Sequence, residues 1–397
     1  MSNDPNDQAC TPDAFALLHH VVGVRLARGL LTVVDATNVQ PEARRPLLAL
    51  ARRHHLPAVA VVFDLPEQVS HARNAGRPDR YVAPRAIHHQ HALLGRSLPG
   101  LAREGFRAVH VLHAEEEVAG ATIVRAPLPC NRAGDHGPFD AVGDVHGCAD
   151  ELEALLAVLG YAPDAAADAD GVRAWRHPEG RQAVFVGDLV DRGPRTPDVL
   201  RIAIGMTEAG TALAVPGNHD VRLLKALRGQ LVHRTHGLAQ SMEQLDATTP
   251  AFRARATAFL DGLASHYVLD GGRLVVAHAG LTAELQGRDS GAVRAFALYG
   301  EATGERDEFG LPVRGAWAAD YRGRAAVVYG HTPVADPAWV HDTLDVDTGC
   351  VFGGRLTALR WPERGLVSVP ALRPYAEPRR AFLPAAGGGA PDGPPTV

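Results

Sequence analysis

Five short motifs place carboxylate, amide or imidazole groups directly after apolar runs that have the character of strands. They are Gly143-Asp-Val-His-Gly147, Gly187-Asp-Leu-Val-Asp-Arg-Gly-Pro194, Gly217-Asn-His-Asp220, Ala277-His-Ala-Gly280 and Gly330-His-Thr-Pro333. Any one of them could be an ordinary turn or a helix-capping loop. Because sites in open α/β sheets form at the carboxyl ends of the strands, the five motifs together predict one convergent site.

The side chains in these motifs favour a pair of divalent metal ions. Mixed Asp, Asn and His ligands suit Mn²⁺, Fe²⁺ or Zn²⁺ better than Ca²⁺, and the motifs lack the thiolates of a structural zinc site. A carboxylate between two histidine-bearing half-sites can bridge two ions about 3.5–4 Å apart, an arrangement that promotes displacement at phosphorus. The motifs therefore predict a metal-dependent phosphoester hydrolase.

In this order, the five motifs resemble the signature of the calcineurin-like metallophosphoesterases. The resemblance implies an α/β fold with a central β-sandwich flanked by helices and a binuclear metal site. It implies that Asp144 and His146 bind the first ion and that Asp188 bridges the two. The second ion would be bound by Asn218, His278 and His331. Asp347 is implied as a further ligand near the first ion, with Asp345 as an equally acidic neighbour. Mn²⁺ is the expected ion, and Fe, Ni and Zn are alternatives.

Three further residues are expected to take part in catalysis, two by contacting the substrate and one by holding its neighbour in place. Arg192 would clamp its oxygens with a forked guanidinium, a geometry that lysine does not offer. His219, held by Asp191, would protonate the leaving oxygen, because a positioned imidazole is the usual general acid near neutral pH.

The rest of the chain divides into segments of different character. Residues 1–127 alternate short β-branched runs at 32–35, 58–64 and 109–112 with helical spacing at 42–55, which predicts a parallel sheet. Residues 128–138 have the Pro, Gly and polar composition of a linker, and 139–370 contain the five motifs. Residues 371–397 are rich in Pro and Gly and are expected to be disordered.

The first segment resembles part of a P-loop kinase domain. The run Asp35-Ala-Thr-Asn-Val-Gln-Pro-Glu-Ala-Arg44, followed by the phosphoesterase motifs, is similar to the bacterial polynucleotide kinase-phosphatases of RNA repair. That resemblance implies hydrolysis of a 3′-phosphate or 2′,3′-cyclic phosphate at nucleic-acid ends, with RNA 3′ ends or nucleotide phosphoesters as partners.

The sequence departs from that family at both ends. No glycine-rich phosphate loop precedes Asp35, and Lys225, the only lysine among the 40 basic residues, lies in the other segment. Kinase activity is therefore not expected, since ATP phosphates would have no amide and lysine cradle. The ligase-like module of the family is also missing. A genuinely shortened kinase domain and a start assigned too late both remain open.

Alternative functions share the same chemistry. The motifs contact only a phosphoryl group, so a Ser/Thr protein phosphatase and a dinucleoside tetraphosphatase remain open, as does a non-enzymatic scaffold remnant. Arginines that precede the Gly-His-Thr motif, among them Arg314 and Arg322, could meet a nucleotide backbone while Trp317 or Tyr321 stacks a base. A solvated arginine surface explains these residues equally well.

Composition excludes several classes of protein. The chain has 397 residues, of which 46% are hydrophobic, and a net charge of −5, so it is not disordered as a whole. Its four cysteines are far apart and no secretory signal is recognisable, so a reducing cytoplasm is expected. No apolar run is long enough to span a membrane. An incomplete parallel sheet would leave an exposed edge, so a homodimer or RNA-repair partner proteins are the expected protein partners.

Overall fold

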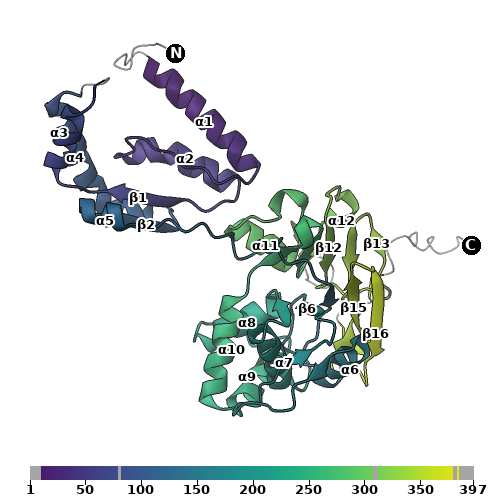
Figure 1. The fold of residues 1–397 in the computed structure, drawn as a ribbon. Coiled ribbons are helices and arrows are strands. Elements are labelled where there is room, and N and C mark those ends of the chain that lie inside the picture. Colours follow the sequence, from purple (N-terminus) through teal and green to yellow (C-terminus); the bar gives the residue numbers. More distant parts are fainter. Residues whose placement is uncertain (1–9, 79–81, 307–311, 379–381, 384–397) are drawn as a thin grey trace, which may run out of the picture. The chain divides into compact units, whose positions relative to one another are not determined.

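Two structural units make up the fold of the computed structural model (Figure 1). The structure describes residues 10–78, 82–306, 312–378 and 382–383. Unit 1 comprises Met1–Ala126 and Arg288–Ser290, and unit 2 comprises Pro127–Gly287 and Gly291–Val397.

Unit 1 combines helices with a small parallel sheet. Strands β1 (Val59–Phe63) and β2 (Ala108–Leu112) pair in parallel, with Val59 opposite Ala108 and Phe63 opposite Leu112. The helices are α1 (Thr11–Ala27), α2 (Pro41–Arg53), α3 (Glu67–Ala75), α4 (Pro84–Ser97), the 3₁₀ helix η2 (Leu98–Arg103) and α5 (Glu115–Gly120). Helix α2 begins at Pro41, a residue that suits the first helical turn because its missing N–H would have had no partner there.

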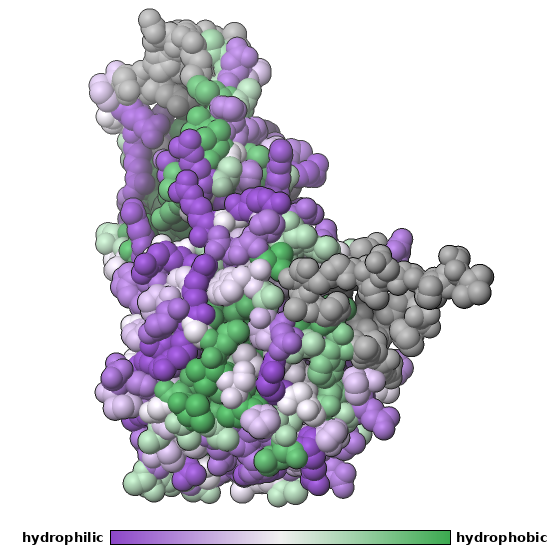
Figure 2. Space-filling model, turned by 90° about the vertical axis from the view of Figure 1, so that its right-hand side faces the viewer, coloured by the Kyte–Doolittle hydropathy of each residue, from purple (hydrophilic) through white to green (hydrophobic). Residues whose placement is uncertain are grey.

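The sheet of unit 1 is smaller and less buried than the sequence predicts. The predicted strand at 32–35 is wrong, because these residues have irregular structure and Val33 is 85% exposed. Val59, Val61 and Phe63 alternate with partly buried neighbours and are themselves exposed, so β1 has one uncovered face. Figure 2 shows hydrophobic residues in green among the hydrophilic residues on the face that it presents.

Unit 2 is built on two five-stranded sheets that pack face to face. The first has the order β16-β15-β3-β6-β7 and the second the order β13-β14-β12-β9-β8. The strands of the first are β3 (Phe139–Val142), β6 (Gln182–Phe185), β7 (Ala212–Ala214), β15 (Arg355–Trp361) and β16 (Gly365–Pro370). Those of the second are β8 (His266–Leu269), β9 (Leu274–Ala277), β12 (Ala326–Tyr329), β13 (Trp339–Val340) and β14 (Thr343–Asp345). One apolar cluster, which includes Phe139, Val184, Leu274 and Val328, fills the space between the sheets.

Helices cover the outer face of each sheet, so the predicted β-sandwich flanked by helices is confirmed. The first sheet is covered by α6 (Ala149–Leu159), α7 (Thr196–Glu208), α8 (Asn218–Leu227), α9 (Leu238–Asp246) and α10 (Pro250–Gly262). The second is covered by α11 (Gly291–Tyr299) and α12 (Trp317–Asp320). Within the described part of the chain, no helix has the length and apolar character needed to cross a membrane.

Short elements complete unit 2. They are β4 (Ala162–Pro163), β5 (Trp175–Arg176), β10 (Ala302–Arg306), β11 (Pro312–Arg314) and the 3₁₀ helices η3 (Asp270–Gly272), η4 (Ala283–Leu285) and η5 (Cys350–Phe352). Strands β4 and β5 form an antiparallel pair, as do β10 and β11. These pairs lie outside the two five-stranded sheets, so the sandwich does not depend on them.

The expectation of a disordered tail from residue 371 is wrong for its first residues. The backbone N–H of Leu372 and the hydroxyl of Tyr375 both donate to Oε1 of Glu151, at 2.9 and 2.8 Å. Ala371, Tyr375 and Ala376 pack against the core between the first sheet and its helices. Residues 379–381 and 384–397 of the predicted tail lie outside the described residues.

A buried ion pair within the first sheet gives a test of the packing of unit 2. Asp140 on β3 is fully buried and accepts hydrogen bonds from Arg181 and from the hydroxyl of Tyr161. We expect Asp140→Ala to lower the free energy of unfolding by about 3–5 kcal/mol, because Arg181 would keep a buried charge without that partner. Tryptophan fluorescence in urea measures this, since all four tryptophans lie in unit 2.

Asp164→Ala is the matched control for this measurement. It breaks an exposed ion pair with Arg176 and should cost less than about 1 kcal/mol. An equal decrease in the free energy of unfolding in Asp140→Ala and Asp164→Ala would contradict a special role for the Asp140 pair.

Candidate metal centre

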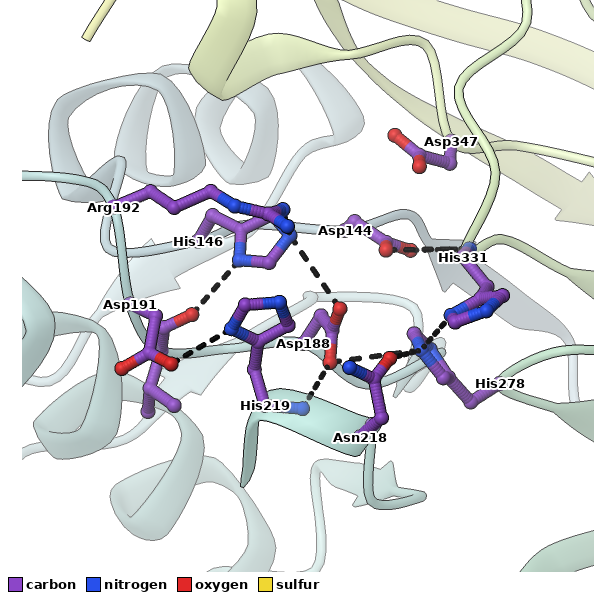
Figure 3. Close-up of polar contacts among 12 residues, drawn as sticks. Asp144, His146, Asp188, Asp191, Arg192, Asn218, His219, His278, His331 and Asp347 are labelled. Atoms are coloured by element: carbon purple, nitrogen blue, oxygen red, sulfur yellow. Dashed lines mark hydrogen bonds and ion pairs between the residues drawn. The ribbon is translucent and has the colours of Figure 1, made fainter. Parts of the chain in front are cut away.

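The ends of parallel strands from both sheets meet at one site (Figure 3). Strands β3, β6 and β7 run parallel, and Asp144, Asp188 and Asn218 follow their carboxyl ends. Strands β9, β12 and β14 run parallel in the second sheet and lead into the other ligand candidates, His278, His331 and Asp347. The structure thus brings every predicted metal ligand into one cluster, together with Asp191, Arg192 and His219.

The backbone turns sharply where these side chains leave the strands. His146, Asp188 and His331 have positive φ angles of 47°, 46° and 76°, in a region that residues other than glycine rarely occupy. Gly217 has to be a glycine for a different reason, because a Cβ there would collide with the Asp188 carboxylate and backbone. The glycine of the Gly-Asn-His-Asp motif therefore allows two motif loops to touch.

Asp188 and two imidazoles form the first group of ligand atoms. The ligand atoms of His146, Asp188 and His219 lie within 4.8 Å of one another. Nδ1 of His146 donates to the Val190 carbonyl at 2.8 Å, which leaves Nε2 facing Oδ2 of Asp188 at 3.4 Å. A backbone carbonyl that fixes the ring in this way is the usual support of a metal-binding histidine.

Asp188 also belongs to a second group, with His278 and His331. Nδ1 of His278 lies 3.0 Å from the Val186 carbonyl, and its Nε2 lies 3.5 Å from Oδ1 of Asp188. The same Nε2 is 3.2 Å from the amide oxygen of Asn218 and 3.1 Å from Nδ1 of His331. Because Asp188 presents one oxygen to each group, its position suits a bridging ligand.

A third set of carboxylates borders these groups. Burial and mutual repulsion with Asp347, Asp188 and Asp345 raise the pKa of Asp144 well above its usual range. Burial raises the pKa of Asp347 to about 7. Burial and the charge of Asp347 likewise raise the pKa of Asp345. Carboxylates crowded in this way are stabilised by a bound cation.

The imidazoles have the opposite effect on the shared carboxylate. Burial opposes ionisation of Asp188, but His278, His219, His146 and His331 together hold its pKa below the usual range. Burial also lowers the pKa of His146 and of His278, which favours the neutral rings that metals bind. Carboxylates, neutral imidazoles and one amide are a donor set that fits borderline divalent ions.

His219, whose ring belongs to the first of these groups, is itself held by a carboxylate. Its Nδ1 lies 2.7 Å from Oδ2 of Asp191, and both side chains are buried. Ser241 on α9 fixes Asp191 twice, since its hydroxyl donates to Oδ1 at 2.7 Å and accepts from the Asp191 N–H at 3.1 Å. The sequence did not reveal Ser241, which lies in no motif and is 50 residues away from Asp191.

Arg192 reaches into the same cluster. Its Nη1 lies 2.6 Å from Nε2 of His146, and its guanidinium lies over the ring of Phe352, 5.1 Å from the ring centre. The Arg192 guanidinium therefore lies beside the predicted metal ligands (Figure 3).

Three of the substrate-binding residues expected from the sequence, Trp317, Tyr321 and Arg322, do not lie in this cluster. Trp317 and Tyr321 are only 8% and 4% exposed and pack with α11 beneath the second sheet, where neither ring can stack a base. Arg322 donates to the carbonyls of Ala319 and Tyr321. The side chain of Arg314 lies outside the described residues.

Two cysteines that are distant in sequence are neighbours in the fold. The sulfurs of Cys148 and Cys350 and a carboxylate oxygen of Glu151 lie within 4.8 Å of one another, and all three residues are buried. Both cysteines are free thiols. Cys148 lies two residues after His146, and Cys350 lies three residues after Asp347. The sequence alone did not predict that the two cysteines are in proximity.

Comparisons with known proteins agree with this geometry. The calcineurin-like phosphoesterase family matches residues 137–335, and an AAA domain family matches residues 1–97. The second match fits the prediction of a P-loop-kinase-like segment at the N-terminus. The metal-ligand candidates from Asp144 to His331 lie inside the phosphoesterase match, and Asp347 lies beyond its end.

Several similar bacterial proteins carry the name bis(5′-nucleosyl)-tetraphosphatase PrpE [asymmetrical]. The relative from Anoxybacillus flavithermus is 43% identical over 254 residues, which are 62% of this chain and 99% of the relative. The relative from Bacillus subtilis is 44% identical over 245 residues, which are 61% of this chain and 98% of the relative. The relative from Geobacillus thermodenitrificans is 44% identical over 241 residues, which are 60% of this chain and 96% of the relative.

Removal of the shared carboxylate tests the metal centre directly. We expect Asp188→Ala to weaken Mn²⁺ binding by more than the roughly 10–100-fold that loss of a supporting residue costs, because both ligand groups lose a member. Isothermal titration calorimetry measures affinity and stoichiometry. Asp261→Ala, which removes an exposed carboxylate paired with Arg228, should bind Mn²⁺ as the wild type does. Wild-type binding by Asp188→Ala would refute the bridging assignment.

Proposed function

Because this chain belongs to the calcineurin-like phosphoesterase family, we propose that it hydrolyses dinucleoside tetraphosphates. Asymmetrical cleavage of four linked phosphates releases a nucleoside monophosphate and a nucleoside triphosphate. The observation that carries the proposal is the 43% identity over 99% of a relative named as such a tetraphosphatase. The ligand candidates from Asp144 to His331 lie in the part of the chain that matches the phosphoesterase family.

Divalent ions would be held by the clustered carboxylates, imidazoles and amide, namely Asp144, His146, Asp188, Asn218, His278, His331 and Asp347. When bound, two such ions neutralise phosphoryl oxygens and make hydroxide available near neutral pH. Mn²⁺ is the ion that we propose, and Fe, Ni and Zn remain alternatives.

His219 is the proposed general acid. The Asp191 carboxylate accepts a hydrogen bond from Nδ1–H of the ring and stabilises the imidazolium, which directs the Nε2 proton toward the leaving oxygen. Ser241 prevents the Asp191 carboxylate from turning away, because it bonds to both the side chain and the backbone of that residue.

Arg192 would change partners during the reaction. Its Nη1 now lies against Nε2 of His146, the atom whose lone pair a metal ion requires. With an ion held at that nitrogen, the Arg192 guanidinium would lose this contact and would bind two phosphoryl oxygens in its forked geometry.

RNA ends are the second candidate substrate. The similarity of residues 1–97 to an AAA domain family favours it, because P-loop kinase segments accompany phosphatases in RNA-repair enzymes of the kind that the sequence resembles. The relatives named as tetraphosphatases match this chain over 99% and 98% of their own length, which is 62% and 61% of this chain. Because nearly the whole length of these relatives matches this chain at 43% and 44% identity, we place the dinucleoside tetraphosphate first.

A substrate panel separates these candidates. With Mn²⁺, we expect diadenosine tetraphosphate to give AMP and ATP, with a higher kcat/KM than 3′-phosphorylated RNA, 2′,3′-cyclic nucleotide or a phosphopeptide. Chromatography of the nucleotide products distinguishes this result from symmetrical cleavage to ADP. Chelation with EDTA should abolish turnover. A higher kcat/KM for RNA or phosphopeptide would overturn the proposal.

The proton-donating pair can be tested by substitution. We expect His219→Ala to lower kcat about 10²–10⁴-fold, the usual contribution of a positioned acid. Ser241→Ala should lower kcat by less and leave KM nearly unchanged, because it only releases the Asp191 carboxylate. The exposed His233 provides the matched control, and His233→Ala should retain wild-type kcat. An unchanged kcat in His219→Ala would rule out this role.

A further inference from the structure

A pocket of about 290 Å³ opens next to the metal centre in unit 2. Its walls include two arginines, two glutamines, a proline and a tyrosine, namely Arg192, Arg373, Gln240, Gln244, Pro374 and Tyr375. Arg192 belongs to both places, because its guanidinium also lies against His146 (Figure 3). A ligand that touches Arg192 from the metal centre can therefore continue into this pocket.

The pocket has the chemistry of an anion site. Two guanidinium groups line it, and no carboxylate is among the described residues that do so. Arginine binds phosphate oxygens through paired, charge-assisted hydrogen bonds. The volume of the pocket is close to the lower end of the roughly 300–1,000 Å³ that is typical of small-molecule sites. This volume suits one nucleotide rather than a whole dinucleoside tetraphosphate.

One wall of the pocket is held by hydrogen bonds to a buried carboxylate. Glu151 is buried, and its Oε1 accepts hydrogen bonds from the Leu372 N–H and the Tyr375 hydroxyl, on either side of Arg373. The Arg373 guanidinium lies over the Tyr375 ring, 5.3 Å from its centre. The backbone is held on both sides of this exposed arginine, because the Tyr375 N–H also donates to the Val351 carbonyl at 2.9 Å. Tyr375 thereby positions Arg373.

The opposite wall is held in a similar way. The side-chain amide of Gln244 donates to the Gly193 carbonyl at 3.1 Å, and its oxygen accepts from the Thr196 N–H at 2.8 Å. These bonds fix the loop that carries Arg192. Gln240, one helical turn earlier on α9, is exposed at the pocket.

We propose that this pocket binds the part of a nucleoside polyphosphate that extends beyond the attacked phosphorus. Arg373 contacts the distal phosphates and Tyr375 positions Arg373. This inference rests on the proposed function, since it assigns the far half of the same substrate. It also explains why a segment that the composition assigns to a disordered tail packs against Glu151.

ATP serves as the probe in the test, because it carries the phosphates and nucleoside of the distal half. Its inhibition constant against p-nitrophenyl phosphate hydrolysis is measured at constant free Mn²⁺. We expect Arg373→Ala to raise this constant about ten-fold or more, as loss of a charge-assisted hydrogen bond predicts. Arg373→Glu should raise it further. Arg176→Ala removes an exposed arginine that does not line the pocket and should leave the constant unchanged.

A second measurement separates this inference from the proposed function. The ratio of kcat/KM for diadenosine tetraphosphate to that for p-nitrophenyl phosphate should fall about ten-fold in Arg373→Ala and stay constant in Arg176→Ala. Suppose that the wild type cleaves the tetraphosphate, and that Arg373→Ala and Arg176→Ala have the same inhibition constant and the same kcat/KM ratio. The pocket assignment is then wrong and the proposed function stands. If the wild type does not cleave it but inhibition by ATP still depends on Arg373, the proposed function fails and the nucleotide pocket stands.

Discussion

The candidate metal centre depends on one carboxylate, Asp188, that two groups of candidate ligands share. Asp188 faces His146 with one oxygen and His278 with the other. Burial alone would favour its neutral form, but the surrounding imidazoles keep it ionised. Its backbone φ of 46° and the absence of a side chain at Gly217 are both needed to bring it so close to the neighbouring loop.

The apolar layer between the two sheets gives this carboxylate its partners. Asp188 follows a strand of the first sheet, whereas His278 and His331 follow strands of the second. The apolar cluster to which Val184 and Val328 belong holds the two sets of strand ends beside each other. A close-packed interior permits little displacement of one sheet relative to the other, so the hydrophobic core determines the positions of the candidate ligands.

Arginine has a specific use at this site. Arg192 lies beside the predicted metal ligands and Arg373 lies across the adjoining pocket. Planar guanidinium groups suit phosphate oxygens better than a lysine ammonium does, so a chain with one lysine loses nothing at this site. The kinase-like unit 1 differs, because a phosphate loop of that type uses a lysine.

The sequence by itself determined the candidate ligands, because each lies within a few residues of the strand that carries it, and the resemblance of the motifs to a known family predicted the sandwich fold. Local motifs such as Gly-Asp-Val-His-Gly keep chemistry and backbone turn together, so both can be recognised without a structure. Contacts between distant segments could not be recognised in this way. Ser241 supports Asp191 from another helix, and Glu151 anchors Tyr375 across 224 residues. Trp317 and Tyr321 had the composition of a base-binding surface, yet they pack inside the core. Only the tertiary structure decided these roles, because burial and long-range hydrogen bonds arise when the sheets and helices pack together.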